Sequence, residues 1–262
     1  MAYAENDGVK IYWEEQGEGD PLLLIMGLGY TLEMWYRIAP VLAEHYRVIT
    51  FDNRGVGRTD VPEGPYPIPT MAGDAMAVLD AAGIDRAHVL GASLGGLVAQ
   101  EVALLYPERV RALILACTHP GLQNAIAASD EVMEKLRARG SMPAEQGVRL
   151  MIPHIYDSST PRERIEEDLE IRMRTYPTEQ GYTAQVAGAL TWEGYDRLPS
   201  IKAPTLVLQG ENDELVPPEN ARVIAEQIPG AELAIIPNAS HIFMTDATDE
   251  SNKAVLGFLA DK

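Results

Sequence analysis

One short stretch, Gly91–Gly96 (GASLGG), constrains this chain more than any other. An apolar run, Ala87–Leu90, precedes it, and residues with helical spacing follow it through Leu104. A strand that turns directly into a helix strains the residue at the apex, and glycines two positions to either side avoid a collision there. Ser93 is therefore expected to present its hydroxyl beside the free N–H groups of a helix N-terminus, where an acyl-transfer nucleophile belongs. The same pattern also occurs by chance, so its meaning depends on the rest of the chain.

Around this stretch, strand-like and helical segments alternate. This alternation predicts a mostly parallel sheet with helices on both faces. The segment 9–15 has the alternating pattern of an edge strand. Thr70 is expected to cap a helix that stops at Gly83. The predicted strands are 9–15, 22–26, 46–51, 87–90, 110–117, 204–209 and 232–236, and the predicted helices are 33–44, 70–82, 94–106, 219–227 and 251–259.

The alternation stops after Cys117. Only helical periodicities follow, at 126–136, 144–151, 162–173 and 180–190. The sequence thus predicts an α/β core made of residues 1–119 and 196–262, with a helical cap, or lid, of residues 120–195. A surface excursion without a role is the alternative. Insertion between two strands, at one end of the sheet, favours a lid over the site.

Composition narrows the class of partner. The 262 residues carry a net charge of −18, which argues against nucleic acids and anionic membranes. The single cysteine, Cys117, permits no disulfide within the chain. There is no signal-like N-terminus, no long apolar span, no cysteine–histidine cluster and no phosphate-cradling glycine loop. We therefore expect a cytoplasmic protein that acts on a small molecule without metal or cofactor, and a homo-oligomer remains open.

A serine nucleophile needs a base within hydrogen-bond reach. Of the five histidines, His45 and His88 fit structural positions and His154 lies in the helical region. His241 follows the strand that ends at Ile236, so it can face the same sheet edge as Ser93. We predict His241 as the base, with His119, which also follows a strand, as the weaker alternative.

The base in turn needs a carboxylate to fix its tautomer. Asp213 lies in the turn Gly210–Pro217, directly after a strand, and Glu211 and Glu214 are rivals in the same loop. No carboxylate follows the strand that ends at Cys117. The order Ser93, Asp213, His241 is the nucleophile–acid–base order expected of such a sheet.

Taken together, these motifs resemble the α/β-hydrolase fold superfamily. The shared features are Met26-Gly27-Leu28-Gly29 followed by Trp35, Asp52–Gly57, Gly91–Gly96, Gly210–Asp213 and Ser240-His241. The resemblance covers nearly the whole chain outside residues 120–195. Within the superfamily the chain is similar to small capped enzymes: esterases, enol-lactonases, polyketide methylesterases, and cofactor-free haloperoxidases or perhydrolases. It implies Ser93 as nucleophile, Asp213 as acid and His241 as base.

The resemblance also implies an oxyanion hole made by the main-chain N–H groups of Leu28 and Leu94. Many relatives have histidine where this chain has Met26. Because the donors are main-chain groups, this change need not disable the hole, and it makes the wall there more apolar. Asp52 and Arg54 are expected to pair with each other and brace the oxyanion loop.

The expected function is hydrolysis of small carboxylic esters through an acyl-serine intermediate. Alternatives are a lactonase or specialised methylesterase, a peroxide-dependent perhydrolase or haloperoxidase, and a non-catalytic ligand receptor on the same fold. An aspartate nucleophile is disfavoured because the elbow holds Ser93, and a hydroxynitrile lyase because no lysine lies near the expected mouth. Candidate pocket residues, each equally compatible with the core, are Met26, Met34, Trp35, His119, Met151, Tyr156, Trp192, Val216, Ile242 and Phe243.

Overall fold

The computed structural model describes residues 2–139 and 141–262. Its centre is an eight-stranded sheet in the order β1-β2-β4-β3-β5-β6-β7-β8, in which only β1 and β2 run antiparallel to their neighbours. This confirms the predicted mostly parallel sheet. Met1 and Gly140 fall inside the predicted ranges but outside the described residues. The strands are β1 (Ala2–Asn6), β2 (Val9–Gln16), β3 (Pro21–Ile25), β4 (Arg47–Phe51), β5 (Ala87–Ala92), β6 (Val110–Ala116), β7 (Thr205–Gly210) and β8 (Glu232–Ile236).

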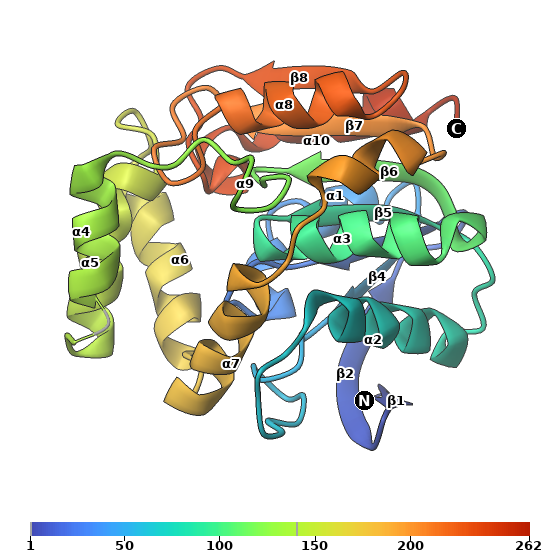
Figure 1. The fold of residues 1–262 in the computed structure, drawn as a ribbon, viewed down its shortest axis with the longest axis horizontal. Coiled ribbons are helices and arrows are strands. Elements are labelled where there is room, and N and C mark those ends of the chain that lie inside the picture. The colour runs from blue at the N-terminus through green and yellow to red at the C-terminus, as the bar shows by residue number, and fades with distance from the viewer. Residues whose placement is uncertain (1, 140) are drawn as a thin grey trace.

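Helices cover both faces of this sheet. In Figure 1, α2 (Ile68–Ala81), α3 (Leu94–Leu105) and α8 (Glu219–Gln227) lie in front, and α1 (Ala39–Leu42) and α10 (Thr248–Leu259) lie behind. The central strand β3 shows why both faces are needed. Leu23 and Ile25 pack into one apolar cluster and Leu22 and Leu24 into the other, and all four are fully buried. The continuous apolar run is thus explained by burial on both faces.

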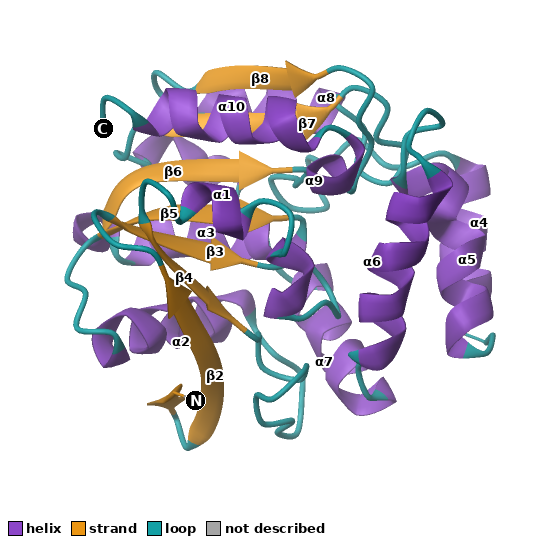
Figure 2. Ribbon diagram, turned by 180° about the vertical axis from the view of Figure 1, so that it is seen from behind, coloured by secondary structure: helices purple, strands orange, loops and turns teal. Residues whose placement is uncertain are grey.

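A group of helices follows β6 and precedes β7. These are α4 (Asp130–Arg139), α5 (Ala144–Ile155), α6 (Arg162–Arg174) and α7 (Glu179–Leu190). Figures 1 and 2 show them gathered beyond the arrowheads of the strands, at the carboxyl end of the sheet. We refer to residues 120–195 as the helical insertion. No helix in the described part of the chain is long and apolar enough to cross a membrane.

Five local predictions differ from the structure, one of them being the last helix, α10, which begins at Thr248 and not at residue 251. The segment 9–15 is not the edge, because β1 pairs outside it. The predicted helix 33–44 is split into a 3-10 turn, Leu32–Trp35, and α1, where Pro40 lacks the N–H needed for a continuous helix. Helix α2 begins at Ile68 after Pro67, two residues ahead of Thr70, with no side-chain cap. Helix α4 begins at Asp130, not at residue 126.

Candidate active site

Ser93 occupies the junction between β5 and α3 with φ +54° and ψ −116°. This is a strained backbone region for a residue with a side chain, and such strain is typical of functional turns. The neighbouring glycines are required by close approach. A Cβ on Gly91 would overlap the carbonyl of Gly95, and a Cβ on Gly95 would overlap that of Ile25. The Ser93 N–H donates to the Ala116 carbonyl at 2.9 Å, which ties the elbow to β6.

His241 and Asp213 form a buried pair, with 2.8 Å between Nδ1 and Oδ2. Three further donors fix the carboxylate: the N–H of Leu215 at 2.9 Å, the N–H of Val216 at 2.8 Å and the amide of Gln209 at 2.8 Å. A carboxylate opposite Nδ1 favours the tautomer with hydrogen on Nδ1. Nε2 is then left free to accept a proton.

Ser93 and His241 line the same cavity, although they lie 148 positions apart in the chain. No hydrogen bond joins them in this structure. Such contacts are often long before substrate binds and shorten in the complex.

Two main-chain donors flank Ser93. Leu94 is the first residue of α3, so its N–H has no acceptor within the helix. The N–H of Leu28 likewise donates to no acceptor in the described chain, and both residues line the cavity. Gly27 brings this loop close to the nucleophile, since a Cβ there would lie 3.3 Å from the Ser93 Cβ. These two N–H groups are placed to hold a negatively charged oxygen.

The cavity has a volume of about 390 Å³ and is lined mainly by apolar side chains from both the core and the helical insertion. Five of the predicted pocket residues line it: Met26, His119, Met151, Val216 and Ile242. The insertion contributes the opposite wall, chiefly Ala125–Ala128, Met133, Leu136, Ile155, Val186 and Leu190. A site of this kind suits a small, mostly apolar substrate held next to a nucleophile.

Comparison with known proteins identifies the family of the chain. A family model for the alpha/beta hydrolase fold matches residues 20–248. The chain belongs to this family. RutD of Azorhizobium caulinodans, which its name assigns provisionally to carbamate hydrolysis, is 33% identical over 265 aligned residues, covering 100% of this chain and 99% of that protein. A poly(3-hydroxyalkanoate) depolymerase from Ectopseudomonas oleovorans is 32% identical, covering 91% of this chain and 84% of that protein. The solved structure of Est816, described as an N-acyl homoserine lactone degrading enzyme, matches with a TM-score of 0.86 at 32% identity, covering 98% of this chain and 100% of that one.

The alternative base of this α/β-hydrolase, His119, and the alternative acids, Glu211 and Glu214, do not form the expected pair. His119 lines the cavity, but its Nδ1 accepts from the Gly121 N–H at 3.2 Å and burial lowers its pKa to about 4. Glu214 contacts His154 at 2.5 Å, and among the described residues neither it nor Glu211 bonds to His241. The geometry therefore favours His241 with Asp213.

The other five predicted pocket residues do not line the cavity. Two of them, Met34 and Phe243, are buried in the core. Trp35 is 1% exposed and packs into the core cluster that includes α1 and α10. Tyr156 donates to Asp168 of α6 at 3.0 Å, and Trp192 donates to Glu101 of α3 at 2.7 Å. The pocket prediction is wrong for Trp35, Tyr156 and Trp192, because each satisfies its packing or its polar atom away from the cavity.

The expected pairing of Asp52 with Arg54 is also wrong. Arg54 forms two 2.6 Å hydrogen bonds with Asp74 of α2. Asp52 still supports the oxyanion loop, Met26–Leu32, by accepting from the Leu32 N–H at 2.8 Å. Asn53 supports its other end by donating to the Met26 carbonyl at 2.8 Å.

Sequence reasoning missed two insertion residues that hold the same loop. Gln185 of α7 is fully buried; its Oε1 accepts from the Gly29 N–H and its Nε2 donates to the Arg54 carbonyl, each at 2.8 Å. Arg172 of α6 donates to the Gly29 carbonyl. The peptide groups on both sides of Gly29, next to Leu28, are thus fixed by the insertion. Neither residue stands in a sequence pattern that predicts this role, because α6 and α7 have no sharply apolar face against which a polar residue would stand out.

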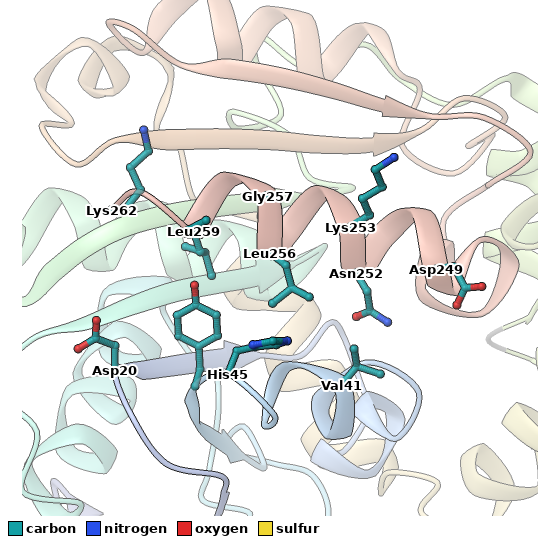
Figure 3. A pocket seen from close by; sticks show the side chains of 12 residues that line it. Asp20, Val41, His45, Asp249, Asn252, Lys253, Leu256, Gly257, Leu259 and Lys262 are labelled. Carbon is teal, nitrogen blue, oxygen red and sulfur yellow. The ribbon is translucent and has the colours of Figure 1, made fainter.

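A wider hollow lies between α1 and α10, away from the nucleophile (Figure 3). Asp20, His45 and Lys253 line it, but Ser93, Asp213 and His241 do not. Ser93 and His241 instead line the cavity that faces the insertion, with Asp213 behind His241. Within the described residues no cluster of histidine, cysteine and carboxylate side chains could hold a metal ion.

Proposed function

We propose that this α/β-hydrolase cleaves small carboxylic esters, with Ser93 as nucleophile, His241 as general base and Asp213 as the group that orients His241. The observation that carries the proposal is the 2.8 Å contact between Asp213 and His241 at the cavity that the strained Ser93 also lines. A buried carboxylate behind an imidazole is the arrangement that activates a serine hydroxyl.

The steps follow from these positions. Nε2 of His241 takes the Ser93 proton as Oγ attacks the acyl carbon, and the carbonyl oxygen becomes negatively charged. The N–H groups of Leu28 and Leu94 stabilise that oxygen. The intermediate collapses by breaking the bond to the alcohol oxygen, which leaves with the proton from His241. Water, deprotonated by His241, then attacks the acyl-serine, and the acid departs as Ser93 regains its proton.

A lactone is the second candidate substrate. The likeness to Est816 over 98% of this chain favours it, and a lactone opens by the same steps with the alcohol retained on the acyl group. Short 4-nitrophenyl esters compared with a panel of lactones would separate the two, since kcat/KM for the natural class should be higher by orders of magnitude.

Labelling with a fluorophosphonate probe and mapping the labelled peptide tests the proposal directly. We expect one label, on Ser93, and none in Ser93→Ala. Ser251→Ala is the matched control, because it removes a buried hydroxyl that donates to the Phe243 carbonyl outside the cavity. A label on another serine, or hydrolysis that persists in Ser93→Ala, would refute the mechanism.

A further inference from the structure

One part of the mainly apolar cavity wall is positively charged. Arg139, at the last position of α4, lines the cavity together with Tyr182 of α7. Its guanidinium carbon lies 5.3 Å from the centroid of the Tyr182 ring. No aspartate or glutamate is among the described residues that line the cavity, and Arg139 is its one arginine or lysine.

A second guanidinium lies behind this wall. Arg172 of α6 is 2% exposed and lies 3.7 Å from the centroid of the Tyr30 ring, itself part of the cavity wall. Its Nε has no hydrogen-bond partner within the described structure. Burial, together with the positive charge of Arg139, lowers the pKa of Arg172.

Neither guanidinium has a carboxylate within 4 Å in the part of the chain described, although the protein carries a net charge of −18. By contrast, Arg54 and Arg37 each meet a buried carboxylate, Asp74 and Asp168 respectively. A buried charge without a counterion costs free energy, and this applies to Arg172, whereas Arg139 is half-buried at the cavity wall. An anionic ligand in the cavity would supply the missing negative charge. The cavity joins this positive region to Ser93.

We infer that Arg139 binds an anionic group of the substrate, a carboxylate separated by a short apolar chain from the ester or lactone carbonyl, with the charge of Arg172 reinforcing the attraction. This inference rests on the proposed function and narrows its substrate class. Arg139 is a specificity residue here: the chemistry at Ser93 does not involve it, and both residues line the same mainly apolar cavity.

Two substrates that differ only at the far end of the acyl chain test this. We would compare mono-4-nitrophenyl adipate, which ends in a carboxylate, with 4-nitrophenyl hexanoate, which ends in a methyl group. Arg139→Gln should lower kcat/KM for the adipate ester about 10- to 100-fold, the usual size of a charge-assisted contact. It should leave the hexanoate ester within about twofold, since apolar contacts remain.

The matched control is Arg137→Gln, which removes the same charge from the exposed side of the same helix. It should change neither substrate by more than about twofold. A parallel pair, the butyrate ester of 6-hydroxyhexanoate and hexyl butyrate, tests an anion on the alcohol side. A selective loss in either pair supports the inference. Equal losses for charged and neutral esters in Arg139→Gln, or no loss in either pair, would overturn it.

Binding without turnover keeps this inference separate from the proposed function. In Ser93→Ala, monomethyl adipate at about ten times its Kd should raise the Tm by about 3 °C, and the uncharged methyl hexanoate at the same concentration should raise it less. Adding Arg139→Gln should abolish the difference. If no ester or lactone is hydrolysed but monomethyl adipate still binds through Arg139, the proposed function fails and the anion site stands. If Ser93-dependent hydrolysis occurs but monomethyl adipate binds no better than methyl hexanoate, the proposed function stands and the anion site fails.

Discussion

The edge of the sheet and the helical insertion contribute to the site in different ways. At the sheet edge, Ser93, Asp213 and His241 each follow a strand, and each is fixed by its own loop. The insertion supplies the opposite cavity wall and the contacts of Gln185 and Arg172 to the oxyanion loop. The groups that we propose to react thus come from strand ends, whereas the insertion contributes cavity wall and hydrogen bonds to the Met26–Leu32 loop.

The insertion is bound to the core at several buried points. Asp168 of α6 accepts hydrogen bonds from Tyr36 at 2.6 Å and from Thr245 at 2.7 Å, and it is 1% exposed. Together with Gln185, these contacts join α6 and α7 to segments on both sides of the nucleophile. A satisfied buried network of this kind rigidifies the groups that it joins. The insertion and the core therefore share one buried hydrogen-bond network.

The largest effect should come from Ser93→Ala. Without the nucleophile, kcat for the best ester should fall by at least about 10⁴-fold. The fold should persist, because Ser93 is anchored by its backbone N–H, so the Tm should stay within about 2 °C. Steady-state assays and thermal unfolding measure the two quantities. A variant that keeps a tenth of the activity would place the nucleophile elsewhere.

Asp213→Asn should be next, with kcat reduced about 10³- to 10⁴-fold, because an amide favours the wrong imidazole tautomer. The matched control is the adjacent Glu214→Gln, whose partner is His154. It should cost less than about fivefold, since His154 is outside the cavity lining. The order of the two kcat values decides the assignment, and a larger loss in Glu214→Gln would reverse it.

The sheet edge was predictable because its signals are local. The glycines of GASLGG indicate a sharp turn from strand to helix, because larger side chains would collide there. The turn at Asp213 follows a run of residues that is recognisable as a strand. The chain order of the three residues added independent support. The sequence therefore predicted the fold and the three residues that the structure brings to one edge.

The insertion was less predictable because its roles depend on tertiary contacts. Its four helices were expected from periodicity, but nothing in the spacing shows that Gln185 reaches Gly29 or that Arg172 lies against Tyr30. Trp192 shows the converse error. Its size and its place in the insertion suggested a pocket residue, but its indole N–H donates to the buried carboxylate of Glu101 and the ring lies outside the cavity.

Gln185→Met tests whether the insertion positions an oxyanion donor. Losing the acceptor for Gly29 N–H should loosen Leu28 and lower kcat about 10- to 100-fold, with KM within about threefold. The affinity of a boronic acid transition-state analogue should fall in parallel with kcat/KM, which a purely structural role would not produce.

Two further variants control this experiment. Gln185→Glu keeps the acceptor and should restore part of kcat. Gln180→Met, on the same helix, removes an exposed contact to the Pro62 carbonyl and should be nearly neutral. If Gln185→Met changes KM alone, the insertion shapes substrate binding and does not position the donor.

The smallest effect should come from His119→Gln, which separates the two histidines at the sheet edge. Burial lowers the pKa of His119 to about 4, so it is neutral at pH 7. Among the described residues, the one hydrogen bond to its ring comes from the Gly121 N–H and none involves a carboxylate. The variant should keep kcat within about threefold, and the acid limb of its pH profile should match that of the wild type. A shifted acid limb would make His119 the base.

The pKa of His119 also has a consequence for stability. Between pH 6.5 and 4 the unfolded chain binds a proton at this histidine that the folded chain does not, so the free energy of unfolding falls as the pH falls. His119→Gln removes this contribution. Urea unfolding at pH 7.5 and 4.5 should show a loss on acidification that is about 2 kcal/mol smaller in the variant. His88, whose pKa burial also lowers to about 4, contributes equally in both proteins and cancels in the comparison. An equal loss in the two proteins would show that His119 takes up its proton in the folded state, so that it would be open to a catalytic role after all.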